Sequence, residues 1–388
     1  EISECLVGSE MCIRDSLHTL TAQRVIQVER EQVYNFAAGP SVMPEQALRT
    51  AAAELLNYHG SGMSVMEMSH RSALFQEIHD SAKAKLKALM EVPDTHEILL
   101  LQGGATAQFA AIPMNLIEDG TADYAVTGNF SNKAAKEAEK YGRVHIAAST
   151  ADTGFDRIPG QSELSFSEGA KYFYYCANNT VYGTEWQYVP EAPAPMVCDM
   201  SSDILSRYVD VSKYGLIYAG AQKNMAPAGL TVVIIDKALA GRELPYTPQI
   251  MSYRTMIEND SLLNTPPCWC IYMLSLTLDW VAAQGGVKAM EELRRERAGI
   301  VYDFLDNSRL FKAHAQADSR SYMNVTFRTG DDGLDAEFIK GASERGLLNL
   351  KGHKLAGGMR ASLYNAMPVE GAKALVEYMK EFEAGHHV

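Results

Sequence analysis

Several features that mark other classes of protein are missing from this chain of 388 residues. No apolar run approaches the roughly 20 residues that a membrane-spanning helix needs. The net charge of −13 is the opposite of the broad basic face that a nucleic-acid-binding protein presents. We therefore expect neither a membrane nor a nucleic acid as a partner.

Metal, disulfide and nicotinamide motifs are missing as well. The six cysteines, at positions 5, 12, 176, 198, 268 and 270, have the spacing of neither a zinc site nor a small disulfide framework. Reduced thiols and a cytoplasmic location are therefore expected. There is no HExxH, Cys-x-x-Cys or acidic cage, so no metal is predicted. GxSxG is absent, and without GxGxxG nothing favours a nicotinamide enzyme.

Length and composition favour an ordinary globular protein of two domains. Hydrophobic residues make up 47% of the chain and charged residues 21%, and the chain is too long for one small core. Residues 1–31 have no clear periodicity, and we expect them to be a disordered or artefactual extension. We predict a large domain over residues 45–290 and a smaller one formed by residues 32–44 with 291–388.

Short apolar strands alternate with helices along the chain, as in EILLL (Glu97–Leu101), DYAVTG (Asp123–Gly128) and KYFYYCA (Lys171–Ala177). This alternation predicts an α/β fold with a mostly parallel sheet that is covered on both faces. TVVIID (Thr231–Asp236) follows the strand LIYAGA after a connection too short for a parallel crossover, so we predict that it runs antiparallel. From about Gly286 a second run of strands and helices predicts the smaller α/β domain.

A helix is predicted to begin at Pro44, which suits the first helical position, and to end at Gly60. Its apolar face would consist of Leu48, Ala51, Leu55 and Leu56.

The stretch LIYAGAQKN places Lys223 just after an apolar strand and two small residues. On these residues alone, a lysine that simply reaches solvent at the strand exit is the better interpretation. The alternative is a Schiff-base lysine, which a carbonyl cofactor such as pyridoxal phosphate requires. Asp199 ends the strand MVCD, 24 residues before Lys223. It is either a turn residue or a carboxylate that keeps a pyridine nitrogen protonated at the same sheet edge.

Three further features lie near predicted strand ends. GGATAQ (Gly103–Gln108) combines two glycines with the start of a helix, whose free amides could bind phosphate; most such turns only connect a strand to a helix. Thr180, after two asparagines, offers a hydroxyl that could bind a ring oxygen, although turn chemistry is the simpler explanation. The third feature is a set of scattered basic side chains that could bind carboxylate and phosphate: His70, Arg71, His353, Lys354 and Arg360.

Several long motifs together resemble a known family: NFAAGP, SVMEMSHR, QFAAIPMN, GAQKN-x-x-PAGLT, NTPP and KGHK-x-x-GGMRAS-x-YNAMP. From about Val33 to the C-terminus the chain is similar to the phosphoserine aminotransferases. These are class-V, pyridoxal-phosphate-dependent transferases of fold type I, the aspartate-aminotransferase fold. The resemblance implies a homodimer whose two subunits share each active site.

The resemblance also implies a role for each candidate residue. Lys223 would be the Schiff-base lysine and proton carrier, and Asp199 the partner of the pyridinium nitrogen. The remaining cofactor contacts would come from Ala105, Thr106, Phe130, Thr180 and Gln222, and from Asn264 and Thr265 of the other subunit. Arg360 would bind the substrate α-carboxylate. The substrate's phosphate or side-chain carboxylate would be surrounded by His70, Arg71, His353 and Lys354, some of them from the other subunit.

Three positions depart from the pattern of many relatives. Phe130 stands where tryptophan often stacks on the cofactor ring, and an aromatic face is kept. Lys354 stands where arginine is common, so charge is retained but two-pronged hydrogen bonding is lost. Ala38 stands where some relatives have serine, which removes one possible hydrogen bond to substrate.

The implied reaction is a reversible, ping-pong transfer of an amino group from glutamate to 3-phosphohydroxypyruvate, in serine biosynthesis. The family often also serves 4-phosphohydroxythreonine formation in vitamin B6 synthesis. The first rival is another pyridoxal-phosphate aminotransferase, or a lyase or cysteine desulfurase on the same fold. A desulfurase would want a catalytic cysteine in a mobile loop, and none of the six lies in an obvious one. A non-catalytic relative is the second rival, but it would have no need of Lys223, Asp199 and Arg360 together.

Overall fold

The computed structural model describes residues 29–386. The chain divides into two compact units, Glu1–Val33 and Tyr34–Val388. In the first unit a short 3-10 turn spans Arg30–Gln32. Most of the predicted extension, residues 1–31, lies outside the described residues, so its character stays a prediction.

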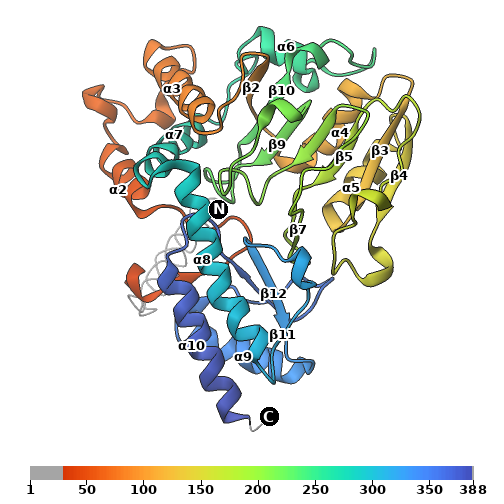
Figure 1. Cartoon of the computed structure of the whole chain (residues 1–388). Helices are drawn as coiled ribbons and strands as arrows, with labels where there is room; N and C mark the ends of the chain where they lie inside the picture. Colours follow the sequence, from red (N-terminus) through yellow and green to blue (C-terminus); the bar gives the residue numbers. More distant parts are fainter. Residues whose placement is uncertain (1–28, 387–388) are drawn as a thin grey trace, which may run out of the picture. The chain divides into compact units, whose positions relative to one another are not determined.

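A seven-stranded sheet with the order β2-β10-β9-β8-β5-β3-β4 forms the centre of the second unit (Figure 1). Its strands are β2 (His96–Leu101), β3 (Thr121–Val126), β4 (Arg143–Ser149), β5 (Phe173–Cys176), β8 (Met196–Asp199), β9 (Leu216–Gly220) and β10 (Thr231–Asp236). β10 pairs antiparallel with both of its neighbours, whereas every other pair in this sheet is parallel. The predicted fold class and the single antiparallel strand are therefore confirmed.

Helices cover both faces of this sheet. The first face carries α2 (Glu45–Glu54), α3 (Ala73–Leu89) and α7 (Cys268–Ala283), and the second carries α4 (Gly104–Leu116), α5 (Asn129–Ala138) and α6 (Tyr253–Glu258). Successive side chains of a strand point to opposite faces. In β9, Ile217 is therefore buried under the helices of the first face and Tyr218 under those of the second. Both faces are buried, which explains why the strands are almost continuously apolar.

A smaller sheet with its own core is formed by the C-terminal part of the chain (Figure 1). Its antiparallel strands are β11 (Lys312–Ala313), β12 (Asn324–Arg328) and β14 (Met359–Ser362), and its helices are α8 (Gly286–Asn307), α9 (Asp332–Glu344) and α10 (Val369–Gly385). Phe36 joins this core, and β1 (Tyr34–Asn35) pairs with β13 (Leu347–Leu348). The separate core supports the domain division given above, which remains a proposal.

The predicted end of the first helix was wrong. α2 stops at Glu54, and Leu55 and Leu56 lie beyond it with 37% and 84% of their surface exposed. The chain leaves the helix because Tyr58 turns inward: its N–H donates to the carbonyl of Met63, and its ring packs edge-on against Tyr272. Leu55 and Leu56 are therefore not part of a buried helix face within one subunit.

Buried hydrogen bonds connect the smaller sheet to the short hairpin of β6 (Asn178–Asn179) and β7 (Thr184–Glu185). Asn178 Nδ2 donates to Asn324 Oδ1 over 2.8 Å, and Asn324 Nδ2 donates to Ser362 Oγ over 3.0 Å. These bonds hold β14 beside β6. Within residues 29–386, no helix has both the length and the apolar character needed to cross a bilayer.

Candidate active site

Lys223 lies in the turn that follows β9, with its amine directed at the neighbouring strand unit. Its Nζ donates to Thr180 Oγ1 over 2.7 Å and lies 5.6 Å from the centre of the Phe130 ring. Thr180 is only 4% exposed. The amine is therefore held at the sheet edge by a hydroxyl and an aromatic face, not by a carboxylate.

The loop of the NFAAGP motif packs directly over this lysine. Ser41 N donates to the carbonyl of Gln222 over 3.0 Å, and Ser41 Oγ donates to the carbonyl of Lys223. Gly39 has a φ of 124°, and a Cβ there would lie 3.1 Å from Lys223 Cγ. Glycine is therefore required for this close approach.

Asp199 ends β8, the parallel neighbour of β9, and is 4% exposed. Its Oδ1 accepts from Ser201 N over 2.8 Å and its Oδ2 accepts from the Tyr218 hydroxyl over 3.0 Å. These two donors fix the orientation of the carboxylate at the end of its strand.

The amine and the carboxylate lie at the same edge of the sheet, because β8 and β9 are parallel and both residues follow carboxyl ends. Cys176, at the end of β5, lies within electrostatic reach of both. Burial raises the pKa of its thiol, the charge of Asp199 raises it further, and the charge of Lys223 opposes this.

The turn GGATAQ opens α4 at the same edge of the sheet. Gly103 caps the helix with a φ of 93°, and Ala105 and Thr106 lie in the first helical turn, where backbone N–H groups have no partner within the helix. Gln222 folds back over Gly220, whose missing side chain leaves the room. This arrangement offers amide donors to an anion such as phosphate.

Arg360 in β14 approaches the site from the smaller sheet. Its Nη1 donates to the backbone carbonyl of Thr180 over 3.2 Å, so Thr180 contacts both Arg360 and Lys223. Burial lowers the pKa of Arg360, and the nearby Tyr364 partly offsets this shift. The Tyr364 hydroxyl donates to the carbonyl of Ala38 over 2.9 Å, which ties the N-terminal loop to the same place.

His353 and Lys354 belong to the segment that leads into β14. Burial lowers the pKa of His353, and the positive charges of Arg360, Lys354 and Lys133 lower it further. Lys354 itself is exposed. The structure therefore brings together Lys223, Asp199, Thr180, Phe130, Arg360, His353 and Lys354.

Four predicted residues, His70, Arg71, Asn264 and Thr265, have no described contact with any member of this group. His70 and Arg71 precede α3; His70 Nε2 is buried without a hydrogen-bond partner, and Arg71 is exposed. Asn264 and Thr265 are exposed in the loop between α6 and α7. The Thr265 carbonyl accepts from Gln102 Nε2 over 2.9 Å, and a cavity of about 310 Å³ is lined by Gly103, Asn264 and neighbouring residues.

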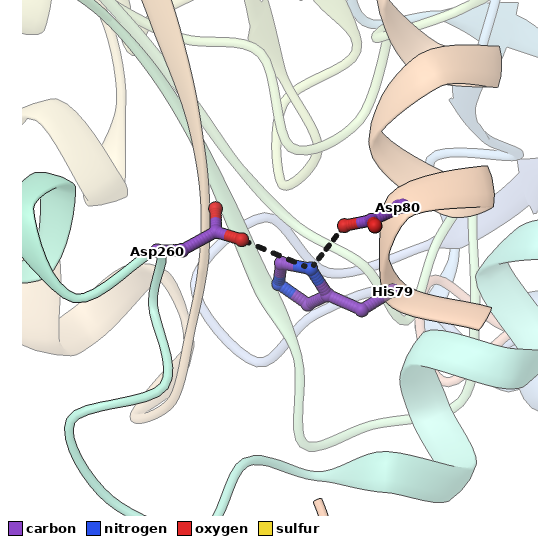
Figure 2. Close-up of side chains that lie close together, drawn as sticks. All are labelled: His79, Asp80 and Asp260. Carbon is purple, nitrogen blue, oxygen red and sulfur yellow. Dashed lines mark ion pairs between the residues drawn. The ribbon is translucent and has the colours of Figure 1, made fainter. Parts of the chain in front are cut away.

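One group of side chains in the described residues has the composition of a metal site: His79, Asp80 and Asp260. Figure 2 shows the His79 ring turned toward both carboxylates, with Nδ1 3.5 Å from Asp80 and 3.6 Å from Asp260. Asp260 already pairs with Lys83 over 2.5 Å, and Asp80 accepts from Gln76 over 2.8 Å. We assign no ion here, because these donors account for both carboxylates.

The residues around Lys223 fit pyridoxal phosphate by their chemistry. Within residues 29–386 the amine contacts the Thr180 hydroxyl and the Phe130 ring but no carboxylate. The buried carboxylate of Asp199 lies at the same edge of the sheet, and the first turn of α4 offers free backbone amides there. Two residues near the site were not predicted from the sequence: Tyr218, which positions Asp199, and Lys133, which lies near His353. Lys133 follows Phe130 by three residues on a predicted helix, and that spacing was the available signal.

Comparison with known proteins gives a consistent family. A family model of class-V aminotransferases matches residues 33–375. The phosphoserine aminotransferase of Pseudomonas fluorescens is 50% identical over 358 residues, which cover 92% of this chain and 99% of the relative.

Two solved structures agree with this match. The phosphoserine aminotransferase of Bacillus circulans subsp. alkalophilus is 42% identical, with a TM-score of 0.90, and the alignment covers 92% of this chain and 99% of that one. The pyridoxal-phosphate-bound enzyme of Trichomonas vaginalis is 40% identical, with a TM-score of 0.87 and coverage of 90% and 99%. The chain therefore belongs to the class-V aminotransferases and, within them, to the phosphoserine aminotransferase family.

Proposed function

We propose that this protein transfers an amino group reversibly between O-phospho-L-serine and 2-oxoglutarate, with pyridoxal phosphate held on Lys223. The products in this direction are 3-phosphohydroxypyruvate and glutamate. The observation that carries the proposal is that the Lys223 amine and the Arg360 guanidinium both contact Thr180, and that neither pairs with a carboxylate of residues 29–386. An amine for a carbonyl cofactor and a guanidinium for a substrate carboxylate are the two groups that transamination needs close together.

Pyridoxal phosphate supplies the carbonyl that takes up the amino group and a ring that withdraws electrons. Lys223 would take the proton from the substrate Cα on its Nζ and return it at the cofactor carbon. Asp199 keeps the ring nitrogen protonated, and Tyr218 and Ser201 hold the carboxylate in orientation. The Phe130 ring covers one face of the site and limits the access of water.

The remaining cofactor contacts concern its phosphate. Ala105 and Thr106 contribute backbone amides, and Gln222 assists. We assign Asn264 and Thr265 to the phosphate of the other subunit's cofactor, since both are exposed in a loop within one subunit.

Substrate binding follows from the basic residues. Arg360 binds the α-carboxylate, which every substrate of the reaction carries. His353 and Lys354 bind the phosphate or side-chain carboxylate, and His70 and Arg71 reach the same group from the partner subunit.

A homodimer would explain why four predicted site residues lie away from the group around Lys223 within one subunit: His70, Arg71, Asn264 and Thr265. Met66 is 59% exposed and Leu56 is 84% exposed, and both lie close in sequence to His70 and Arg71. Exposed apolar side chains next to functional basic ones are typical of a subunit interface. We also propose a cytoplasmic location and a role in serine biosynthesis, with activity on the 4-phosphohydroxythreonine pair as a further possibility of the family.

Two measurements test the proposal. The purified protein should be yellow, and borohydride should fix the cofactor to the peptide that contains Lys223, with no labelled peptide from Lys223→Ala. Glutamate should react with 3-phosphohydroxypyruvate far faster than with pyruvate. A colourless protein that borohydride does not label would overturn the cofactor assignment, and equal rates with pyruvate would favour a different aminotransferase.

A further inference from the structure

Three positively charged side chains, Arg360, Lys354 and Lys133, lie within electrostatic reach of His353, so four basic residues form one group at the candidate site. His353 and Lys354 come from the segment that leads into β14, and Arg360 lies in β14 itself. The fourth, Lys133, lies on α5, on the side of the large sheet, and its charge contributes to lowering the pKa of His353. Two different parts of the fold therefore place positive charge at one point.

Lys133 is directed toward the site by the geometry of α5. Phe130 and Lys133 are three residues apart on this helix, and a long helical side chain points back over the preceding turn. The Lys133 Nζ accordingly lies 5.9 Å from the centre of the Phe130 ring, and the Nζ of Lys223 lies 5.6 Å from the same centre. The two amines share one aromatic side chain.

None of the four basic residues has a carboxylate partner within residues 29–386. Arg360 donates to a backbone carbonyl, and no described ion pair involves His353, Lys354 or Lys133. Carboxylates are plentiful, since the chain has 48 acidic residues against 35 lysines and arginines. On α5 itself Lys140 pairs with Glu137 over 2.6 Å. A group of cations left unpaired in an acidic protein is suited to an anionic ligand.

We propose that Lys133 is a specificity-determining residue whose ammonium binds the phosphate of the phosphorylated substrates, opposite Lys354. This inference rests on the proposed function. A phosphate carries more charge and more acceptor oxygens than the γ-carboxylate of glutamate, so it gains more from an additional cation. Lys354 supplies a point charge and not the two-pronged contact of an arginine, which leaves phosphate oxygens for a second amine.

The test compares Lys133→Met, which keeps the length of the side chain but removes its charge, with Lys133→Arg. Lys136→Met is the matched control, since Lys136 is also exposed on α5. KM and kcat are measured separately for the O-phosphoserine and glutamate half-reactions, together with the inhibition constant of inorganic phosphate and the visible absorption of the cofactor. We expect Lys133→Met to raise KM for O-phosphoserine and the phosphate inhibition constant about tenfold. Lys133→Arg should restore both values.

The glutamate half-reaction of Lys133→Met should change by less than about threefold. The inference is overturned if Lys133→Met behaves like Lys136→Met, or if KM rises equally for glutamate. It is also overturned if the cofactor absorption changes, because Lys133 would then act through Phe130. A wild-type enzyme that does not convert O-phosphoserine would refute the proposed function itself, which separates the two failures.

Discussion

Arg294 in α8 and Arg360 in β14 are both shielded from bulk water, but the charges around them differ. Arg294 is 1% exposed, and its Nη1 lies 2.7 Å from Oε1 of the fully buried Glu185. Arg207 lies 3.6 Å from the same carboxylate oxygen and 3.1 Å from Asp203. Two arginines therefore face two carboxylates in one buried group, whereas Arg360 contacts no carboxylate in the described chain.

The pKa values of Arg207 and Arg360 reflect this difference. Burial acts to lower the pKa of Arg207, but the charges of Glu185 and Asp203 outweigh it and raise the pKa above its ordinary value. Burial lowers the pKa of Arg360, and no carboxylate reverses this effect. The first group is neutralised by the chain itself and serves the fold. Arg360 has no carboxylate partner within the described residues, which is consistent with its proposed role in binding an anionic substrate.

Replacing Arg294 gives the largest expected effect on stability. Arg294→Met leaves the buried charge of Glu185 with the N–H of Tyr322 and the more distant guanidinium of Arg207, so we expect the free energy of unfolding to fall by about 3–5 kcal/mol. Urea denaturation measures this loss. Arg295→Met is the matched control: both guanidinium groups lie over the Tyr322 ring, but Arg295 is half exposed and pairs with Glu291 on the surface. The control should lose less than about 1 kcal/mol.

Equal losses in the two variants would mean that removal of the Tyr322 contact, not the buried charge, determines stability. The distinction between a structural and a functional arginine would then lose its basis.

Replacing Arg360 should give the reverse result. Arg360→Met removes the proposed partner of the substrate α-carboxylate, so kcat/KM should fall about 10²-fold in both half-reactions. No buried carboxylate is left behind, and the free energy of unfolding should change by less than about 1 kcal/mol. Steady-state kinetics with O-phosphoserine and with glutamate, and urea denaturation of the same preparations, measure both quantities. Arg360→Lys should lie between wild type and Arg360→Met, because it keeps the charge but loses the planar fork.

A loss confined to one substrate would place Arg360 away from the α-carboxylate, since both substrates carry that group. A large loss of stability in Arg360→Met would mean that Arg360, like Arg294, serves the fold. The proposed difference between the two arginines would then be wrong.

Local patterns in the sequence predicted much of the fold. The antiparallel direction of β10 follows from a connection too short for a crossover, and the sheet edge of Lys223 and Asp199 follows from parallel strands. The end of α2 did not follow from its apolar spacing. Tyr58 is drawn into a core built with Tyr272, more than two hundred residues away, and a helical periodicity contains no information about such a partner.

Local sequence patterns also do not reveal which charged residues of the site are paired. The sequence shows that Lys223 follows a strand. The lack of a carboxylate beside Arg360 in the described chain depends on how the smaller sheet packs against the large one. The sequence around Glu185 does not distinguish it from an exposed glutamate. In the structure, however, Glu185 of β7 is fully buried against Arg294 of α8. Pairing between distant elements is decided by tertiary packing, so sequence motifs could not separate the paired arginine from the unpaired one.

His79 is a buried titratable side chain that differs from both Arg294 and Arg360. Among the three residues, its replacement should have the smallest effect. Neither ring nitrogen has a hydrogen-bond partner in the described chain, and Nδ1 lies 3.5 Å from Asp80 and 3.6 Å from Asp260. Burial lowers the pKa of His79 below its ordinary value of 6.5, and the charge of Asp260 only partly offsets this. Below pH 6.5 the unfolded chain binds a proton that the folded chain does not. The stabilisation is therefore complete above that pH and is lost as the pH falls toward the lowered pKa.

His79→Leu should remove this acid sensitivity. Between pH 7 and pH 5, wild type should lose about 1 kcal/mol more of its free energy of unfolding than His79→Leu does. Urea denaturation at both pH values measures the difference. His59→Asn reports the effect of losing a surface histidine, since His59 is largely exposed and asparagine tolerates its positive φ of 48°. Parallel pH profiles for wild type and His79→Leu would show that Asp80 and Asp260 stabilise a charged His79, which would move it to the group of paired charges that contains Arg294.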